Sequence, residues 1–120
     1  MSVLDPNDPR ANEIRCQLSS LARQPGRRSV VFSQKAPTRW QTLQVTNPET
    51  GFPFSDAGAW ELIADQIDSG VEIKYVKLDK PSGAIGYAFL MKIDPKRLPI
   101  YVKLQLGAGV VIGRSFHYDD

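Results

Sequence analysis

The chain has 120 residues, 42% hydrophobic and 23% charged, which are proportions of a globular domain that needs neither disulfides nor metal to fold. With a single cysteine and a single histidine, the composition argues against a disulfide framework and against a protein-only zinc or haem site. No apolar stretch approaches the roughly 20 residues that span a membrane, and the first residues have neither the basic start nor the apolar run of a signal peptide, so we expect a cytoplasmic protein without membrane contact.

The net charge of +2 hides a strong segregation along the chain. Residues 1–45 hold seven Lys/Arg against three Asp/Glu, and residues 74–114 hold eight against two. Residues 46–73 between them hold six acids and no base. Because local fields steer ligands more than net charge does, we expect a basic sheet beside an acidic helix.

The first predicted element is a helix that begins after Asp8, a typical N-cap, with proline in its first turn and Pro25-Gly26 at its end. Its narrow apolar stripe, at i, i+4 and i+7, consists of Ile14, Leu18 and Leu21. A short candidate strand follows at 29–32. Residues 34–53 are rich in Pro and Gly and are interpreted mainly as loop, with a further candidate strand at 40–45.

A second helix is predicted at 56–69, with Ser55 as N-cap and Gly70 at the position that favours a left-handed residue. Its inward face consists of Trp60, Ile63, Ala64 and Ile67. Its other face carries Glu61, Asp65 and Asp68, with no lysine four residues away to offset their repulsion. This acidic face is either simply solvated or a docking face for a basic partner or for basic loops of the same chain.

Four strands are predicted next, at 71–78, 84–92, 100–106 and 110–118, separated by turn residues. Their connections are short, which favours a mostly antiparallel meander. We therefore predict one α+β domain over 1–120: two helices packed on one face of a mostly antiparallel twisted sheet, ending in a C-terminal β-hairpin.

The register of that hairpin decides which side chains share the face away from the helices. A three-residue loop at 107–109 would pair Leu106 with Val110, whereas a two-residue loop would pair Gly107 with Val110. The apolar pattern favours the three-residue loop but then places Arg114 on the core side. A β-bulge at Gly113 would resolve this conflict and let Arg114 and His117 share the open face.

The hairpin gathers groups suited to phosphate chemistry, and the candidate catalytic residues are Lys103, Arg114, His117 and Tyr101. Taken singly, each has a plainer explanation, such as a solubilising charge or cross-strand packing. No nucleotide-binding or zinc-protease motif accompanies them, so we expect neither cofactor nor metal. Metal-free RNA cleavage stays open, because RNA supplies its own nucleophile and the protein needs only a base, an acid and cations.

The same stretch resembles the ending of MqsR-type toxins, which belong to the RelE-like group of bacterial toxin–antitoxin systems. Ile-Tyr-Val-Lys-Leu at 100–104, a short turn and Ser115-Phe116 carry the resemblance. It implies a compact α+β fold and a metal-free endoribonuclease that cuts mRNA and is held inactive by a partner antitoxin. It also implies that Lys103 lies among the active-site cations, with Tyr101 and the last strand beside it.

Two other functions are consistent with the sequence. One is a non-catalytic protein-interaction module, such as an antitoxin, an immunity protein or a phage regulator, with Glu61, Asp65 and Asp68 as its partner-binding residues. The other is a nucleic-acid-binding domain without turnover. For RNA contacts outside the catalytic group, the basic segments offer Lys77, Lys92, Arg27 and Arg28.

Overall fold

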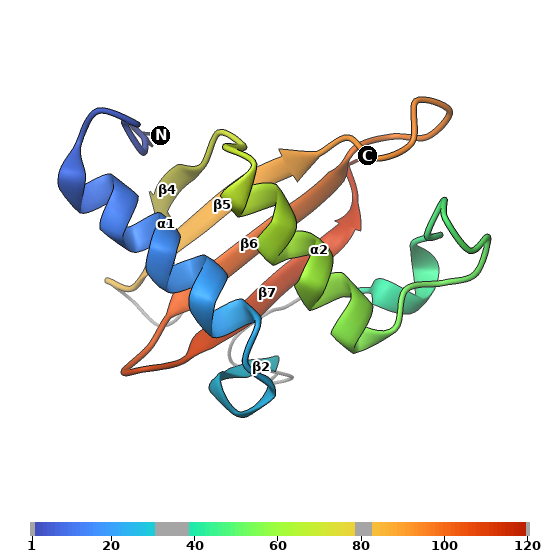
Figure 1. The fold of residues 1–120 in the computed structure, drawn as a ribbon, viewed down its shortest axis with the longest axis horizontal. Coiled ribbons are helices and arrows are strands. Elements are labelled where there is room, and N and C mark those ends of the chain that lie inside the picture. Colours follow the sequence, from blue (N-terminus) through green and yellow to red (C-terminus); the bar gives the residue numbers. More distant parts are fainter. Residues whose placement is uncertain (1, 31–38, 79–82, 120) are drawn as a thin grey trace.

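In the computed structural model, which describes residues 2–30, 39–78 and 83–119, two helices lie across one face of a seven-stranded sheet (Figure 1). The predicted α+β architecture, with the helices on one face of a mostly antiparallel sheet, is confirmed. Parts of three predicted segments lie outside the described residues: 31–32 of the strand at 29–32, 34–38 of the loop, and 81–82 of a turn.

Both helices begin where their capping residues predicted. Helix α1 spans Pro9–Ala22, and the Asp8 carboxylate accepts a hydrogen bond from the Arg10 backbone N–H at 2.9 Å. Helix α2 spans Asp56–Asp68, and the Ser55 hydroxyl accepts one from the Gly58 N–H at 3.0 Å. These side chains satisfy backbone donors that the first turn of a helix leaves without a partner.

The core fills the space between the helices and the sheet. The predicted inward face of α2 is buried, and α1 contributes the small side chains of Ala11 and Ala22 together with Leu18. The opposing layer consists of alternate residues of the central strands, namely Tyr87, Phe89, Met91, Ile100, Val102, Leu104, Val111 and Phe116. This single apolar layer fixes which face of each strand turns away from the helices.

The sheet has the strand order β1-β4-β5-β6-β7-β2, and β3 also pairs with β7. In chain order, the strands are β1 Ser2–Val3, β2 Arg28–Val30, β3 Arg39–Trp40, β4 Lys74–Lys77, β5 Ile85–Met91, β6 Ile100–Leu106 and β7 Val111–Tyr118. Strands β4 to β7 form the predicted antiparallel meander. The strand predicted at 40–45 is wrong, because Thr42–Gln44 is a 3₁₀ helix and only Trp40 of that range is in a strand.

Strands β2 and β3 lie end to end along the outer edge of β7, and both pair with it in parallel. β2 pairs with Val111 to Gly113, and β3 pairs with Ser115 and Phe116. The last strand is therefore covered on its second edge, which leaves it central in the sheet and not at an exposed rim.

The connection between β6 and β7 corrects the predicted register. Leu106 pairs with Val111, and the Gly107 N–H donates to the Val110 carbonyl at 2.9 Å, so the loop is the two-residue Ala108-Gly109. The favoured three-residue loop is wrong. Gly109 has a φ of 70°, which a glycine adopts without a steric penalty, and this permits the tighter turn.

The predicted β-bulge, in contrast, is confirmed, one residue beyond its expected place. Leu104 pairs with Gly113 and Lys103 with Ser115, so Arg114 is the extra residue of β7. Before the bulge, Val111 and Gly113 face the core. After the bulge Phe116 does so, which satisfies the apolar pattern on both sides of the shift.

Gly113 is required by a neighbouring aromatic ring. A Cβ atom at this position would lie 2.6 Å from Cζ3 of Trp40, so no larger residue fits unless the indole moves. The Trp40 ring in turn lies 4.9 Å from Trp60 and 5.5 Å from Phe116, between centroids. Through this contact β3 is packed against both α2 and the last strand.

Candidate functional site

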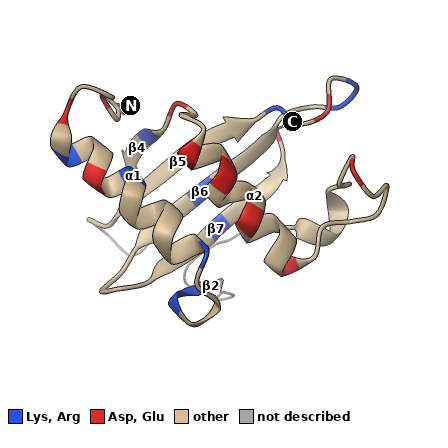
Figure 2. Cartoon of the chain, viewed as in Figure 1, with Lys and Arg blue, Asp and Glu red and all other residues tan. Residues whose placement is uncertain are grey.

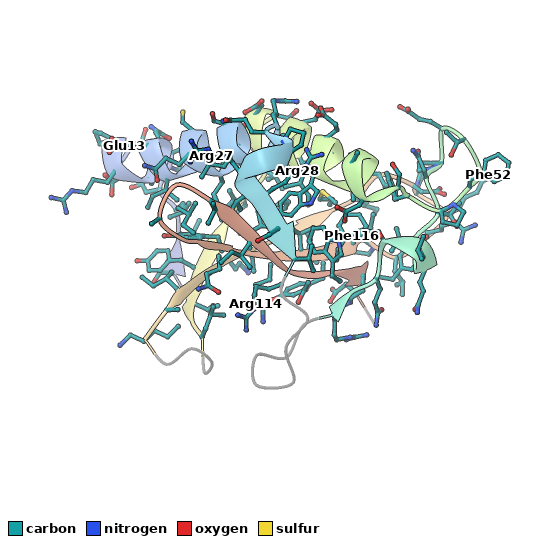
Figure 3. The ribbon with its side chains drawn as sticks, turned by 90° about the horizontal axis from the view of Figure 1, so that it is seen from below. Glu13, Arg27, Arg28, Phe52, Arg114 and Phe116 are labelled. Carbon is teal, nitrogen blue, oxygen red and sulfur yellow. The ribbon has the colours of Figure 1, made fainter. Side chains whose placement is uncertain are left out.

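The face of the sheet away from the helices, here called the outer face, carries the predicted hairpin residues. Strand alternation and the printed register place on it Ser29, Arg39, Lys74, Val76, Gly86, Ala88, Leu90, Tyr101, Lys103, Gln105, Ile112, Arg114, Ser115 and His117. Figure 3 shows Arg114 on this side and Phe116 between the sheet and the helices. The prediction that a bulge brings Arg114 and His117 to one face is confirmed.

One row of directly paired residues crosses the outer face and carries three cations. Lys74 pairs with Ala88, Ala88 with Lys103, and Lys103 with Ser115, which also pairs with Arg39. With neighbouring strands about 4.8 Å apart, this cation row is about 19 Å long. Small Ala88 and Ser115 separate the long cationic side chains, so the row presents positive charge along a line.

Charge is also sorted between the two layers of the fold. None of the described strands contains Asp or Glu, whereas they hold Arg28, Arg39, Lys74, Lys77, Lys103 and Arg114. Figure 2 shows basic positions on the strands and acidic positions along α2. The predicted basic sheet beside an acidic helix is therefore present, and its field favours an anionic ligand on the outer face.

Arg114 lies on the outer face but is largely covered, with 4% of its surface exposed. Its Nη1 donates to Oε1 of Gln105 at 3.1 Å, across the bulge. A guanidinium in this position adds positive charge beneath the cation row and fixes the Gln105 amide. Because Nη1 is already engaged by Gln105, Arg114 is suited to a supporting role more than to direct contact with a ligand.

The other two candidate catalytic residues form a stacked pair. Tyr101 and His117 are directly paired across β6 and β7, with ring centroids 5.5 Å apart and planes inclined by 35°. Nδ1 of His117 lies 2.7 Å from the Tyr118 carbonyl oxygen, which can only accept, so Nδ1 carries the proton in this contact. In the neutral imidazole Nε2 is then the basic nitrogen.

The phenol of Tyr101 is kept protonated by its surroundings. Burial raises its pKa above the usual value, and the nearby Asp119 carboxylate raises the pKa further. The Asp119 N–H donates to the Pro99 carbonyl at 2.8 Å, which holds Asp119 near the start of β6. The Tyr101 hydroxyl therefore keeps its proton at neutral pH, and it lies beside an imidazole whose Nε2 carries the lone pair.

A cavity of about 290 Å³ opens beside this pair, over β4, β5 and β6. Its lining residues are Val71, Glu72, Lys74, Ala88, Phe89, Leu90, Tyr101 and Asp119. The cavity thus joins one end of the cation row to the flank of the Tyr101 ring, and two carboxylates are among its lining groups.

The four residues predicted to bind RNA outside the hairpin do not gather on the outer face. Arg28 donates from Nη1 to the Ala22 carbonyl at the end of α1, and Arg27 lies against Gly109 of the β6–β7 loop (Figure 3). Lys77 alternates with Val76 and so points to the helix side, and Lys92 lines a groove with carboxylates of α2. Their role in RNA binding stays a prediction.

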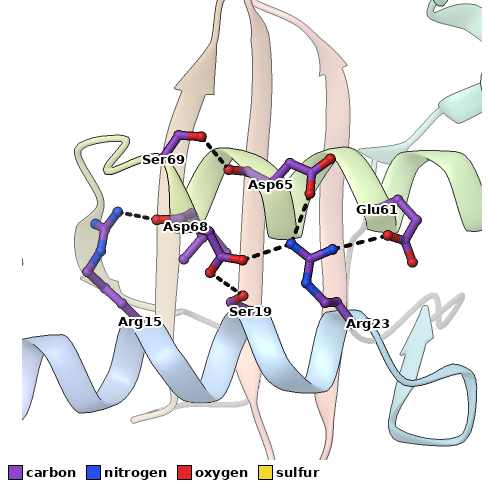
Figure 4. A network of polar contacts seen from close by, with 8 residues as sticks. Arg15, Ser19, Arg23, Glu61, Asp65, Asp68 and Ser69 are labelled. Carbon is purple, nitrogen blue, oxygen red and sulfur yellow. Dashed lines mark hydrogen bonds and ion pairs between the residues drawn. The ribbon is translucent and has the colours of Figure 1, made fainter.

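The acidic face of α2 is engaged by an arginine from the other helix (Figure 4). The guanidinium of Arg23, which caps the C-terminus of α1, lies 3.1 Å from Glu61, 2.9 Å from Asp65 and 2.8 Å from Asp68. The repulsion expected along α2 is thus relieved across the helix pair and not by a lysine on α2 itself. These carboxylates serve an internal contact, and their predicted role in partner binding stays a prediction.

Three further hydrogen bonds extend this network at the end of α2. Arg15 donates from Nη1 to the Val71 carbonyl at 2.6 Å and from Nη2 to the Ile67 carbonyl at 2.7 Å. The Ser19 hydroxyl donates to Asp68. A cation on the last carbonyls of a helix complements its dipole, so Arg15 fixes the end of α2 to α1.

We expect this network to make stability depend on acid pH. The hydrogen bond from Arg23, followed by that from Ser19, lowers the pKa of Asp68 below its usual value. A lowered folded-state pKa adds stability above the unfolded-state pKa of about 3.9, and this stability is lost as pH falls toward the folded-state value. Urea midpoints measured from pH 6 to pH 2 should fall less steeply for Asp68→Asn than for the wild type. Parallel curves for the two proteins would contradict the expectation.

Sequence reasoning missed two members of the cation row. Arg39 stood in a segment interpreted mainly as loop, and Lys74 was one of many lysines in a predicted strand. Strand alternation alone would have placed the side chain of Lys74 on the same face of the sheet as Val76 and that of Tyr75 on the other face. No local signal would have placed Arg39, because its strand pairs with a residue 76 positions later in the chain.

Comparisons with protein-family models, with curated proteins and with solved structures gave no match. In the described part of the chain, no group of three or more His, Cys, Asp or Glu side chains is arranged to hold a metal ion. No helix of the described residues is long and apolar enough to cross a bilayer.

Proposed function

We propose that this protein is a metal-free endoribonuclease that acts on mRNA, in the manner of the RelE-like toxins. The observation that carries the proposal is the position of the Tyr101–His117 pair beside the cation row. Lys103 lies two residues after Tyr101 on β6 and therefore on the same face, so one phosphate can reach both the cation and the pair. Rigid strands hold all of these groups.

The chemistry follows from the protonation of the pair. His117 Nε2 accepts the proton of the 2′-OH as its oxygen attacks the adjacent phosphorus, and the bond from phosphorus to the 5′ oxygen breaks. The Tyr101 hydroxyl, held protonated, donates to the leaving 5′ oxygen. Lys103 stabilises the extra negative charge on the phosphorane. The products are a 2′,3′-cyclic phosphate and a 5′-OH, and solvent returns the proton from His117 to Tyr101.

Arg114 has a different part in this proposal from that of Lys103. Because its Nη1 is bound to Gln105, it acts as a positioning residue that also adds positive charge beneath the phosphate. We therefore expect Arg114→Lys, which keeps the charge and loses the planar guanidinium, to retain partial activity in the RNA-cleavage assay.

Lys103→Gln is expected to lower the rate of RNA cleavage about 10²–10³-fold, the usual effect of removing one group that stabilises transition-state charge. The assay follows a labelled mRNA with purified protein in EDTA and identifies cyclic phosphate ends. Lys96→Gln, an exposed lysine in the loop before β6, is the matched control and should keep full activity. Intact RNA in the presence of wild-type protein would refute the nuclease.

An antitoxin that neutralises the enzyme is part of the same proposal and rests on the resemblance of the hairpin to MqsR-type toxins. Co-expression of a small neighbouring reading frame should relieve growth arrest caused by the wild-type protein. Growth arrest that persists with every adjacent frame would argue against such a partner.

A further inference from the structure

We propose that the cavity over β4, β5 and β6 binds one nucleobase next to the cleaved phosphate, and that it selects bases with an exocyclic amino group against uracil. This inference deepens the proposed nuclease function and rests on it for the position of the phosphate. It concerns the eight lining residues of the cavity, one of which, Tyr101, is also the proposed acid.

The shape of the cavity fits a flat ring. Its volume of about 290 Å³ is at the small end for ligand sites, which suits one base and not a larger cofactor. Ala88 and Leu90 offer an apolar surface from β5, and Tyr101 of the neighbouring strand offers an aromatic one. Since His117 stacks against Tyr101 from β7, the other flank of the phenol ring is turned toward β5 and the cavity.

The polar groups of the cavity favour hydrogen-bond donors on the base. Glu72 and Asp119 contribute carboxylates, which when ionised can only accept hydrogen bonds. Cytosine, adenine and guanine each have an exocyclic amino group that can donate to a carboxylate. The pairing edge of uracil has one N–H between two carbonyl oxygens, and these oxygens would face the carboxylates unfavourably.

Lys74 supplies the remaining polar contact and connects the cavity with the cation row. It lines the cavity and belongs to the row, two strands from Lys103. Its ammonium group can hold the phosphate on the far side of the bound base. A nucleotide in this position would have its base over Ala88 and Leu90 and a phosphate on either side, at Lys74 and at Lys103.

Binding of the four nucleoside 3′-monophosphates, followed by NMR amide shifts at constant salt, tests the inference without requiring cleavage. CMP, AMP and GMP should shift the Ala88 and Leu90 amides and bind at least fivefold more tightly than UMP. Tyr101→Leu should weaken all of them at least fivefold, as expected for loss of base stacking. Glu72→Gln combined with Asp119→Asn should remove the discrimination against UMP, and Glu13→Gln on α1 is the matched control that should change nothing.

Several results would overturn the inference. Equal binding of UMP and CMP, shifts confined to residues outside the cavity, or inorganic phosphate binding as tightly as CMP would each do so. The experiments distinguish failure of the base-pocket proposal from failure of the nuclease proposal. Cleavage of RNA without preference at the flanking base would leave the nuclease and remove the base pocket. Selective nucleotide binding by a protein that leaves RNA intact would keep the pocket and remove the nuclease.

Discussion

His117→Gln is expected to lower the rate of RNA cleavage about 10²–10⁴-fold, because it removes the only imidazole of the chain from the proposed proton transfer. The contact between Nδ1 and the Tyr118 carbonyl fixes the ring so that Nε2 is the basic atom, and a glutamine amide cannot accept a proton there. The rate is measured on the same labelled mRNA as for Lys103→Gln, at several pH values.

A substitution in Tyr101, the residue that stacks on His117, distinguishes loss of proton transfer from loss of packing in the Tyr101–His117 pair. Tyr101→Phe keeps the ring against His117 but removes the proposed acid, so it should lower the rate while the urea midpoint stays near that of the wild type. An acid must be protonated, so the wild-type rate should fall as pH rises through the raised pKa of Tyr101. This alkaline fall should be absent in Tyr101→Phe. Full activity of either variant would contradict the assigned roles.

The parts of the fold that sequence predicted correctly are those determined by local signals. Asp8 and Ser55 mark the helix starts, and the apolar spacing of α2 fixes its buried face. Short turns between β4 and β7 fix the meander, because antiparallel neighbours need few connecting residues. In each case the residues that decide the structure lie within one turn or one hairpin of each other.

The errors occurred where distant residues decide the structure. The favoured pairing of Leu106 with Val110 was wrong, because a two-residue loop was available to Ala108-Gly109, and Leu106 pairs instead with the buried Val111. Strand β3 is only two residues long and depends on the Trp40 ring over Gly113. The residues next to Trp40 or next to Gly113 in the sequence give no indication that these two residues are in contact.

In the candidate site too, local sequence patterns predicted some features, and others depend on residues that are distant in the chain. Alternation along β6 correctly placed Tyr101 and Lys103 on the same face of the sheet. The bulge that brings His117 and Arg114 to that face was predicted from the cost of burying the Arg114 charge on the core side. Arg39, the burial of Arg114 and the cavity with Glu72 and Asp119 depend on the assembled sheet. The charges of α2 illustrate the point, since their partner Arg23 is more than 35 residues away in sequence.

Phe116→Ala is the substitution expected to cost the most stability, about 3–5 kcal/mol, which is typical of a buried phenylalanine truncated to alanine. Phe116 has none of its surface exposed and lies 5.5 Å from Trp40 and 5.7 Å from Phe54, between ring centroids. Truncation would leave a cavity between these rings, and rigid strands on both sides of β7 limit how far the structure can relax to fill it.

The same truncation at Phe52 provides the control, because this side chain is 72% exposed and Figure 3 shows it at the periphery of the molecule. Urea unfolding followed by far-UV circular dichroism should give a much lower midpoint for Phe116→Ala and a midpoint within error of the wild type for Phe52→Ala. The stability of a domain is commonly about 5–15 kcal/mol, so a loss of about 3–5 kcal/mol is a large part of the margin. A small effect at Phe116 would mean that Trp40, and with it Arg39 in the cation row, is held in place by contacts other than this aromatic cluster.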